Sequence, residues 1–223
     1  MVCTEKTATY VMHSPIGDIQ LVVCQKGLHS SSQIISTDDD FCPYQKQQVK
    51  IKSVDIDDQF SKHVKQTVMW FRVYFSNYFD LDDNHQPKLC MDSIQSVFRK
   101  NVWMTLAQNT QPGETTTYGG LMTLMHSKGF SGCAQAVGSA LAVNPFQIIV
   151  PCHRVLPKSG EFGQYAKGKK NKVKEWLLKY EGVGCCQKRK QEHSFGCEDC
   201  VSMEIGPKKI RISTPCQKAL SGS

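Results

Sequence analysis

The sequence has no apolar run approaching the ~20 residues that a membrane-spanning helix requires. Its first residues, MVCTEKTATYVMHSP, lack the basic stretch followed by an apolar segment that marks a secretory signal. No internal repeat is present. Hydrophobic residues make up 40% of the chain and charged residues 21%, which is typical of a globular protein with a sizeable core. We therefore expect no membrane partner. The expected location is the nucleus, with the cytoplasm as a second location.

The eleven cysteines do not favour a disulfide framework. Their number is odd, no secretory signal is recognised, and a chain of this size can build a core without covalent links. In a reducing compartment, some of these thiols are expected to bind metal or to carry out chemistry.

Positive charge is concentrated after residue 90. The net charge is +7, and residues 91–184 contribute +6 of it while residues 1–90 carry −2. Such a basic region is a weak indication of a polyanionic partner such as nucleic acid.

Residues 1–90 read as a small α/β domain. The segment SPIGDIQLVV predicts a turn followed by a strand, and Asp38–Asp40 reads as a loop. An apolar residue recurs every three or four positions from Phe60 to Phe79, which predicts an amphipathic helix. The polar segment Asp80–Lys88 resembles an interdomain linker.

Residues 91–184 predict a mostly helical domain. The first expected helix is marked by Ile94, Phe98, Val102 and Leu106, and a second, over 118–126, is capped by Thr116 or Thr117. A third helix, over 131–143, is capped by Ser131 and ends at Asn144-Pro145. A strand over 146–150, a loop over 158–163 and a helix over 173–180 followed by Gly182 complete the domain. The two central helices, joined at Gly129, form either a helix-turn-helix or an ordinary helical hairpin.

The segment Pro151-Cys152-His153-Arg154 carries the sharpest chemical signal. A bare Cys-His pair is more often structural than reactive. Adjacent side chains in an extended segment point to opposite sides, so we expect no direct bond between Cys152 and His153. A water between them could carry the proton.

The wider pattern resembles one family closely. Gly138 is followed by Asn144-Pro145, then by Pro151-Cys152-His153-Arg154-Val155, then by Glu175-Trp176-Leu177-Leu178 and Glu181-Gly182. These residues and spacings resemble the O6-alkylguanine-DNA alkyltransferases. The resemblance implies an α+β fold: a small N-terminal α/β domain with an antiparallel sheet (1–90) and a catalytic, DNA-binding helix-turn-helix domain (91–184).

The resemblance also implies the chemistry. An alkylated guanine is flipped out of double-stranded DNA, and a thiolate takes the alkyl group once and irreversibly. By this likeness, Cys152 is the nucleophile and His153, acting through water, is its base. Glu181 orients His153, and Asn144 braces the cysteine turn. No organic cofactor is implied, and we expect a monomer.

Further residues correspond by position to the family's base pocket and DNA surface. Tyr118 corresponds to a tyrosine beside the flipped nucleotide, Tyr165 to a pocket wall, and Val155 to a contact with the base edge. The family's serine that bonds guanine O6 falls on Ala166, so that contact is expected from the backbone.

The small-residue helix over 131–143 is expected to enter the minor groove of DNA. Close packing against another helix is the alternative, because it would favour the same small residues. Gln135 stands where the family inserts an arginine into the base stack. Arg99, Gly119 and Lys158 are further expected DNA contacts.

Cys3, Cys24, His29 and Cys90 are the expected ligands of a structural zinc ion, by resemblance to eukaryotic members of the family. His85 is an alternative fourth ligand. Cys197 and Cys200, with Cys185, Cys186 and His193 nearby, could form a second knuckle, although one Cys-x2-Cys is a weak signal. The tail over 185–223 is expected to be loosely ordered, and its Lys188-Arg189-Lys190 and Lys208-Lys209 clusters serve either nuclear import or DNA contact, or are merely solvated.

Two other functions remain open from the sequence. A lesion-binding sensor with weak transfer activity is favoured by Gln135. A cysteine hydrolase would use Cys152 and His153.

Overall fold

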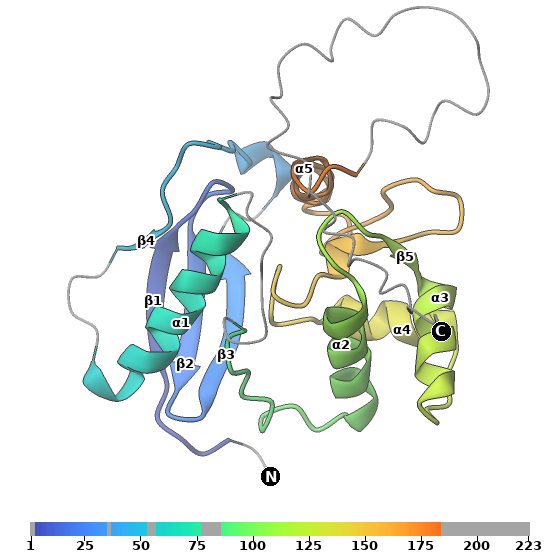
Figure 1. Ribbon diagram of the computed structural model, residues 1–223, viewed down its shortest axis with the longest axis horizontal. Coiled ribbons are helices and arrows are strands. Elements are labelled where there is room, and N and C mark those ends of the chain that lie inside the picture. Colours follow the sequence, from blue (N-terminus) through green and yellow to red (C-terminus); the bar gives the residue numbers. More distant parts are fainter. Residues whose placement is uncertain (1–2, 35–36, 53–56, 77–85, 184–223) are drawn as a thin grey trace, which may run out of the picture. The chain divides into compact units, whose positions relative to one another are not determined.

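The computed structural model describes residues 3–34, 37–52, 57–76 and 86–183, which lie together in one compact unit of the chain. It shows the predicted α+β class, with a four-stranded antiparallel sheet and a set of helices (Figure 1). No helix among the described residues is long and apolar enough to cross a membrane. The expected tail and its metal knuckle, as well as His85, fall outside the described residues.

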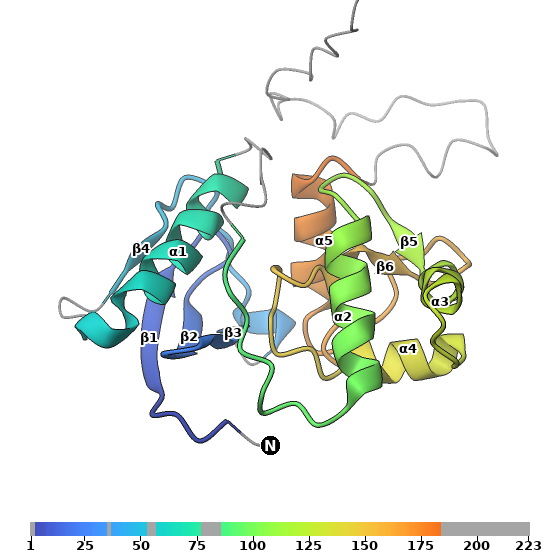
Figure 2. The same ribbon diagram turned by 60° about the horizontal axis from the view of Figure 1, so that its bottom comes forward.

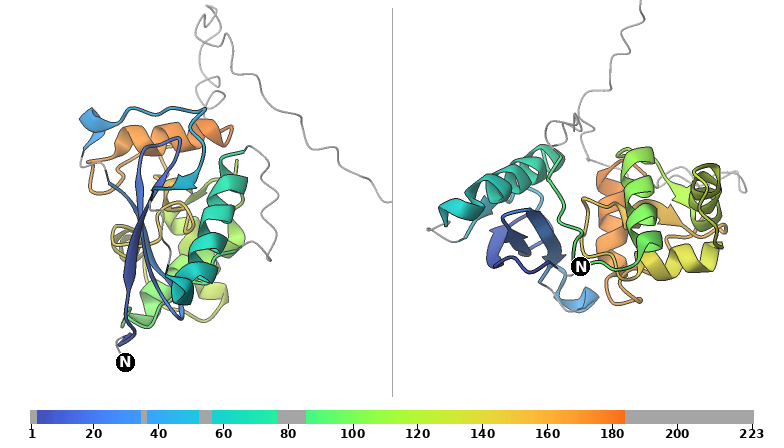
Figure 3. Two further views of the ribbon diagram at one scale, coloured as in Figure 1. Left: turned by 90° about the vertical axis from the view of Figure 1, so that its left-hand side faces the viewer. Right: turned by 90° about the horizontal axis from the view of Figure 1, so that it is seen from below.

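The N-terminal sheet has the strand order β3-β2-β1-β4. Its strands are β1 (Ala8–His13), β2 (Ile19–Cys24), β3 (Gly27–Gln33) and β4 (Lys50–Ile51). Helix α1 (Asp58–Tyr74) lies on one face of the sheet (Figures 2 and 3). Its apolar stripe is buried at Phe60, Val64 and Phe71, so the predicted periodicity marks the face that packs on the sheet.

Two predictions in this part needed correction. Asp38–Asp40 forms a short 3-10 helix, η1, and not an irregular loop, because the N–H of Phe41 donates back to the carbonyl of Asp38. Helix α1 ends at Tyr74, with Phe75 as its C-cap. The final member of the predicted stripe, Phe79, lies outside the described residues.

The second half contains α2 (Val97–Asn109), α3 (Tyr118–Ser127), α4 (Ala134–Leu141) and α5 (Asn171–Tyr180). Helices α2, α3 and α4 pack against one another (Figure 1). A parallel pair of short strands, β5 (Thr116–Thr117) and β6 (Val155–Leu156), connects the start of α3 to the segment after Cys152.

The predicted caps are right at two helix ends and wrong at a third. Thr117 caps α3 by accepting from the N–H of Gly120 at 2.9 Å. Gly182, at φ +82°, follows α5, and its N–H bonds to the carbonyl of Lys179. Ser131 does not cap α4, which begins at Ala134 with Cys133 at the N-cap. The link before it passes close to the Phe98 ring, which a Cβ at Gly132 would meet.

The predicted strand over 146–150 is a tight turn. Ile148 has φ +72°, and the N–H of Val150 donates to the carbonyl of Phe146 at 2.9 Å. The Asn144 side chain closes this turn, because its oxygen accepts from Phe146 N and its nitrogen donates to Val150 O. This turn fixes where the following cysteine lies.

Candidate active site

Cys152 begins a single 3-10 turn, η3 (Cys152–Arg154). The sequence predicted that Cys152 would directly follow a strand. In the structure the chain instead bends at Pro151 and enters this turn. The Asn144 amide donates to Cys152 Sγ at 3.2 Å, and the Tyr165 hydroxyl lies 3.8 Å from the same sulfur. The thiol is therefore placed between two hydrogen-bonding groups.

The environment of this thiol has opposing effects on its pKa. Burial raises the pKa of Cys152, while its hydrogen bonds with Asn144 and Tyr165 and the positive charge of Lys174 lower it. The net pKa is raised, so ionisation depends on the groups around the sulfur.

Lys174 is a charged residue that sequence reasoning missed. It is buried on α5, and its Nζ donates to the Val155 carbonyl at 2.8 Å. Burial lowers the pKa of Lys174 to about 8. The available signal was its spacing, since a lysine three and four residues before Leu177 and Leu178 lies on the apolar face of the helix.

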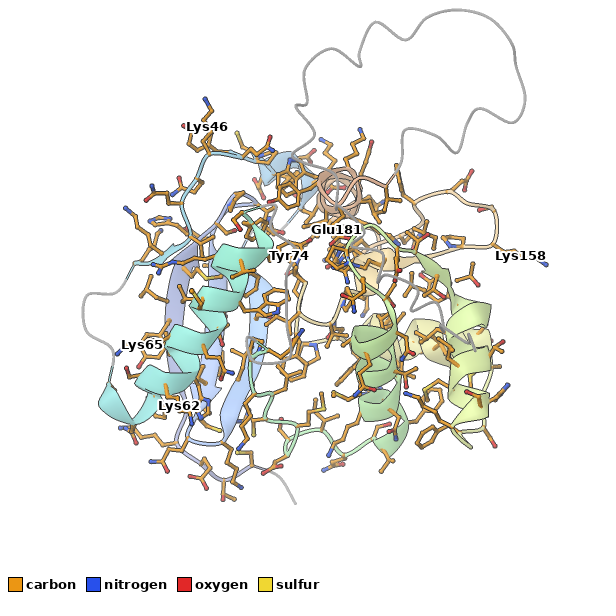
Figure 4. All side chains as sticks on the ribbon, viewed as in Figure 1. Lys46, Lys62, Lys65, Tyr74, Lys158 and Glu181 are labelled. Carbon is orange, nitrogen blue, oxygen red and sulfur yellow. The ribbon has the colours of Figure 1, made fainter. Side chains whose placement is uncertain are left out.

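His153 and Glu181 form a buried pair. His153 Nε2 lies 2.8 Å from Glu181 Oε1, and the Arg154 guanidinium donates to both carboxylate oxygens at 2.9 Å. The Tyr74 hydroxyl donates to Glu181 at 2.6 Å, and Figure 4 shows Tyr74 and Glu181 close together. Burial would raise the pKa of Glu181, but His153 and Arg154 lower it well below its usual range. Neither Arg154 nor Tyr74 was predicted.

The other ring nitrogen of His153 remains available. Burial lowers the pKa of His153, which favours the neutral ring. Nδ1 is buried and has no hydrogen-bond partner among the described residues. A neutral imidazole with one free nitrogen can take up a proton, directly or through water.

A cavity of about 310 Å³ opens beside the thiol. Its lining includes Tyr118, Asn144, Gln147, Cys152, Tyr165 and Ala166. Ala166 adopts the left-handed backbone conformation at φ +48°. Val155, a predicted contact, is not part of this lining and is fully buried. Gln147 was missed, because a glutamine in an apolar stretch carries no motif signal.

Strand β3 holds the turn that precedes Cys152. The N–H of Ser31 donates to the Pro145 carbonyl and the N–H of Gln147 to the Ser31 carbonyl, both at 2.9 Å. The N–H of Gln33 donates to Gln147 Oε1 at 2.8 Å. These contacts span more than a hundred residues of sequence, so no local pattern could reveal them.

The expected DNA contacts are exposed. Gln135 lies in the first turn of α4, Gly119 at the start of α3, and Arg99 on α2. Lys158 extends from the loop after β6 (Figure 4). The buried face of α4 consists of Val137, Ala140 and Leu141. Small residues thus occur on both its packed and its exposed sides.

The four predicted zinc ligands form a cluster remote in sequence from Cys152. The ligand atoms of Cys3, Cys24, His29 and Cys90 all lie within 4.8 Å of one another. The Cys3 and Cys90 sulfurs are 3.8 Å apart, close to the ~3.8 Å edge of a tetrahedron with Zn–S bonds of about 2.3 Å. His29 Nε2 is buried without a partner among the described residues. The donor set therefore fits a tetrahedral metal ion.

The chain closely approaches itself at this cluster. Gly27 has φ +148°, and a Cβ there would collide with the Lys88 carbonyl. The N–H of Leu28 donates to the Lys88 carbonyl and the N–H of Cys90 to the Leu28 carbonyl, both at 2.8 Å. Glycine at this position thus brings the segment carrying Cys90 against the turn that carries Cys24.

Fold and site together define a protein in which a half-buried cysteine lies beside an amide, an imidazole and a carboxylate, at the edge of a small cavity. Comparisons with known proteins agree. The family model described as 6-O-methylguanine DNA methyltransferase, DNA binding domain, matches residues 97–183. The methylated-DNA–protein-cysteine methyltransferase of Cricetulus griseus is 32% identical over 78% of this chain and 81% of its own length. The Homo sapiens protein of the same name is 30% identical over 81% and 82%.

A solved structure is also similar. The crystal structure of Mycobacterium tuberculosis OGT in complex with DNA superposes with a TM-score of 0.53 at 30% identity, over 77% of this chain and 90% of that one. The chain belongs to the methylated-DNA–protein-cysteine methyltransferase family.

Proposed function

We propose that this protein repairs DNA by moving the alkyl group of O6-alkylguanine irreversibly onto its own Cys152. The observation that carries the proposal is the Cys152 thiol, which is hydrogen-bonded by Asn144 and opens onto a cavity of about 310 Å³. Family membership supports methyl transfer from DNA to a protein cysteine. One copy of the chain carries every proposed site residue, so a monomer suffices.

The proposed reaction begins with loss of the thiol proton. His153 accepts it through Nδ1, which has no partner among the described residues, by way of a water. Glu181 stabilises the resulting imidazolium through Nε2. Asn144 and Tyr165 hold the thiolate by their hydrogen bonds, and the charge of Lys174 favours it. The sulfur then bonds to the alkyl carbon as the bond from that carbon to O6 breaks, and guanine leaves with the electron pair.

The proposed DNA surface is formed by α3 and α4. Gln135 and Gly119 are exposed there, and Tyr118 connects this surface to the cavity. We propose that α4 enters the minor groove, which is only about 6 Å wide, since its exposed residues are small apart from Gln135. Base flipping would then bring the alkylated guanine past Tyr118, between Tyr165 and Ala166.

The direct test is mass spectrometry after incubation with duplex DNA containing one O6-methylguanine. The expected result is a gain of one methyl group, located on the peptide with Cys152, that stops at one equivalent. Cys152→Ala should show no gain yet keep nearly full DNA affinity, because phosphate contacts dominate binding. Binding without a mass change would identify a lesion sensor, and repeated turnover of an ester would identify a hydrolase. Either result would replace the proposal.

We further propose that Cys3, Cys24, His29 and Cys90 hold one structural zinc ion. Their donor atoms fit tetrahedral coordination, as described above. Bound zinc would tie the N-terminal residues, the turn after β2 and the segment preceding α2 into one unit. The site would contribute stability and take no part in the transfer.

A further inference from the structure

The amide nitrogen of Gln147 makes no hydrogen bond of ordinary length among the described residues. This atom, Nε2, is buried. An unsatisfied buried donor is destabilising, so such groups in native proteins usually meet water or a ligand. Gln147 lines the same cavity as Cys152 and Tyr165. Gln147 thus contributes to the wall of the reaction cavity.

The orientation of this amide is fixed by strand β3. The backbone N–H of Gln33 donates to Gln147 Oε1 at 2.8 Å, and a donor can be matched only by the oxygen end of an amide. The nitrogen is therefore the end left for another molecule. Lys170 Nζ donates to the Gln33 carbonyl at 2.9 Å and holds this part of β3 in place.

The amide lies beside the group that contacts the thiol. Burial raises the pKa of Tyr165 well above its ordinary value, as does the neighbouring Cys152, and the nearby Gln147 amide acts in the opposite direction. The Tyr165 hydroxyl is 3.8 Å from the sulfur. Amide, hydroxyl and thiol thus line the same cavity. A substrate whose alkyl carbon meets the sulfur there would hold O6 one bond from that carbon.

We infer that Gln147 Nε2 donates a hydrogen bond to O6 of the alkylated guanine and stabilises the charge that this oxygen gains during transfer. The inference rests on the proposed function. As the S–C bond forms, the C–O6 bond breaks and its electron pair moves to O6. The thiol proton leaves through His153, the guanine anion takes one proton from water, and no further reactant is needed. A fixed donor aimed at developing charge costs no reorganisation at the moment of reaction.

The test compares two free bases, O6-methylguanine and 6-(methylthio)guanine, whose sulfur is a weak acceptor. Rates of methyl gain at Cys152 are measured for the wild type, Gln147→Met and Gln147→Glu. Gln147→Glu keeps an oxygen for the Gln33 N–H, so it preserves the link to β3. With the oxygen substrate, both variants should react about tenfold or more slowly than the wild type. With the sulfur substrate, Gln147→Met should lose much less. The oxygen-to-sulfur rate ratio should fall.

Gln164→Met is the matched control, since Gln164 is an exposed amide at the rim of the same cavity and its loss should keep the ratio. Equal losses with both substrates in both Gln147 variants would mean that Gln147 acts only through the turn it holds, which overturns the inference. No methyl gain by the wild type from these bases or from DNA would instead overturn the proposed function itself.

Discussion

Lys174 acts on the reactive thiol at the scale of a single residue. Its charge lowers the pKa of Cys152, while burial lowers the pKa of Lys174 to about 8. We expect Lys174→Met to raise the thiol pKa, so that transfer slows severalfold at pH 7 and partly recovers at pH 9. A pH–rate profile with the free base checks this.

Lys179→Met is the control for that profile. Lys179 lies on the same helix but is exposed and paired with Glu175 at 2.8 Å. It should leave the profile unchanged. If Lys174→Met lowers the rate equally at every pH, its effect is on the position of the Val155 carbonyl and not on the charge of the thiol.

Glu181 has a proposed role in the reaction and also pairs with the buried Arg154, which stabilises the fold. Glu181→Gln leaves the buried Arg154 guanidinium without its carboxylate, and breaking a buried pair in this way costs about 3–5 kcal/mol. Urea unfolding at pH 7 should show that loss in the free energy of unfolding. Glu175→Gln, at an exposed pair on the same helix, should cost less than about 1 kcal/mol.

The pH dependence of stability has a defined sign. The pKa of Glu181 is depressed in the folded state, so its contribution is present above the unfolded pKa of about 4.3 and is lost as pH falls. The pKa of His153 is also lowered, and protonation of the unfolded ring below about pH 6.5 acts in the same direction. The wild type should therefore lose stability on acidification, and the difference from Glu181→Gln should shrink below pH 4. A constant difference would contradict this account.

At the scale of elements, α5 is capped from a distant part of the chain. The Asp38 carboxylate accepts from the N–H groups of Asn171 and Lys172 at 2.9 and 2.8 Å. We expect Asp38→Ala to lower the free energy of unfolding by about 1 kcal/mol, as loss of a helix cap does. Asp39→Ala, at an exposed neighbour in η1, should have little effect in the same denaturation experiment. Equal losses would assign the effect to η1 itself.

Helix α4 offers a separate test of the proposed DNA surface. Glutamine at position 135 fills space but adds no charge, whereas base extrusion costs a few kcal/mol. We expect Gln135→Arg to speed transfer from duplex DNA severalfold, with the gain falling as salt rises. The rate with the free base, which needs no flipping, should not change. Slower duplex repair, or an equal change with the free base, would make Gln135 a packing position.

At the scale of the whole molecule, metal binding is the measurable property. Purified protein should contain about one equivalent of zinc, and chelation should lower the melting temperature without abolishing transfer. Cys90→Ser should lose the metal, whereas Cys42→Ser, at an exposed thiol outside the cluster, should retain it. Metal-free wild-type protein of unchanged stability would contradict the proposal.

Much of the fold and the outline of the site could be predicted from sequence because the signals are local. The stripe that begins at Phe60 predicted α1, although it was extended to Phe79 and the helix ends at Tyr74. Thr116 or Thr117 predicted the start of α3, and Gly182 predicted the end of α5. Each depends on residues within a few positions of one another. The family resemblance, carried by short motifs around Cys152, was confirmed by the comparisons.

What only the tertiary structure decided depends on residues far apart in the sequence. The segment over 146–150 reads as a strand, yet Asn144 and strand β3 make it a turn. Lys174 and Gln147 gain their importance from burial against groups that no periodicity identifies. Local pattern specifies which segments form helices. The free energy of burying a charge or an amide depends on partners that only the folded chain brings within hydrogen-bonding distance.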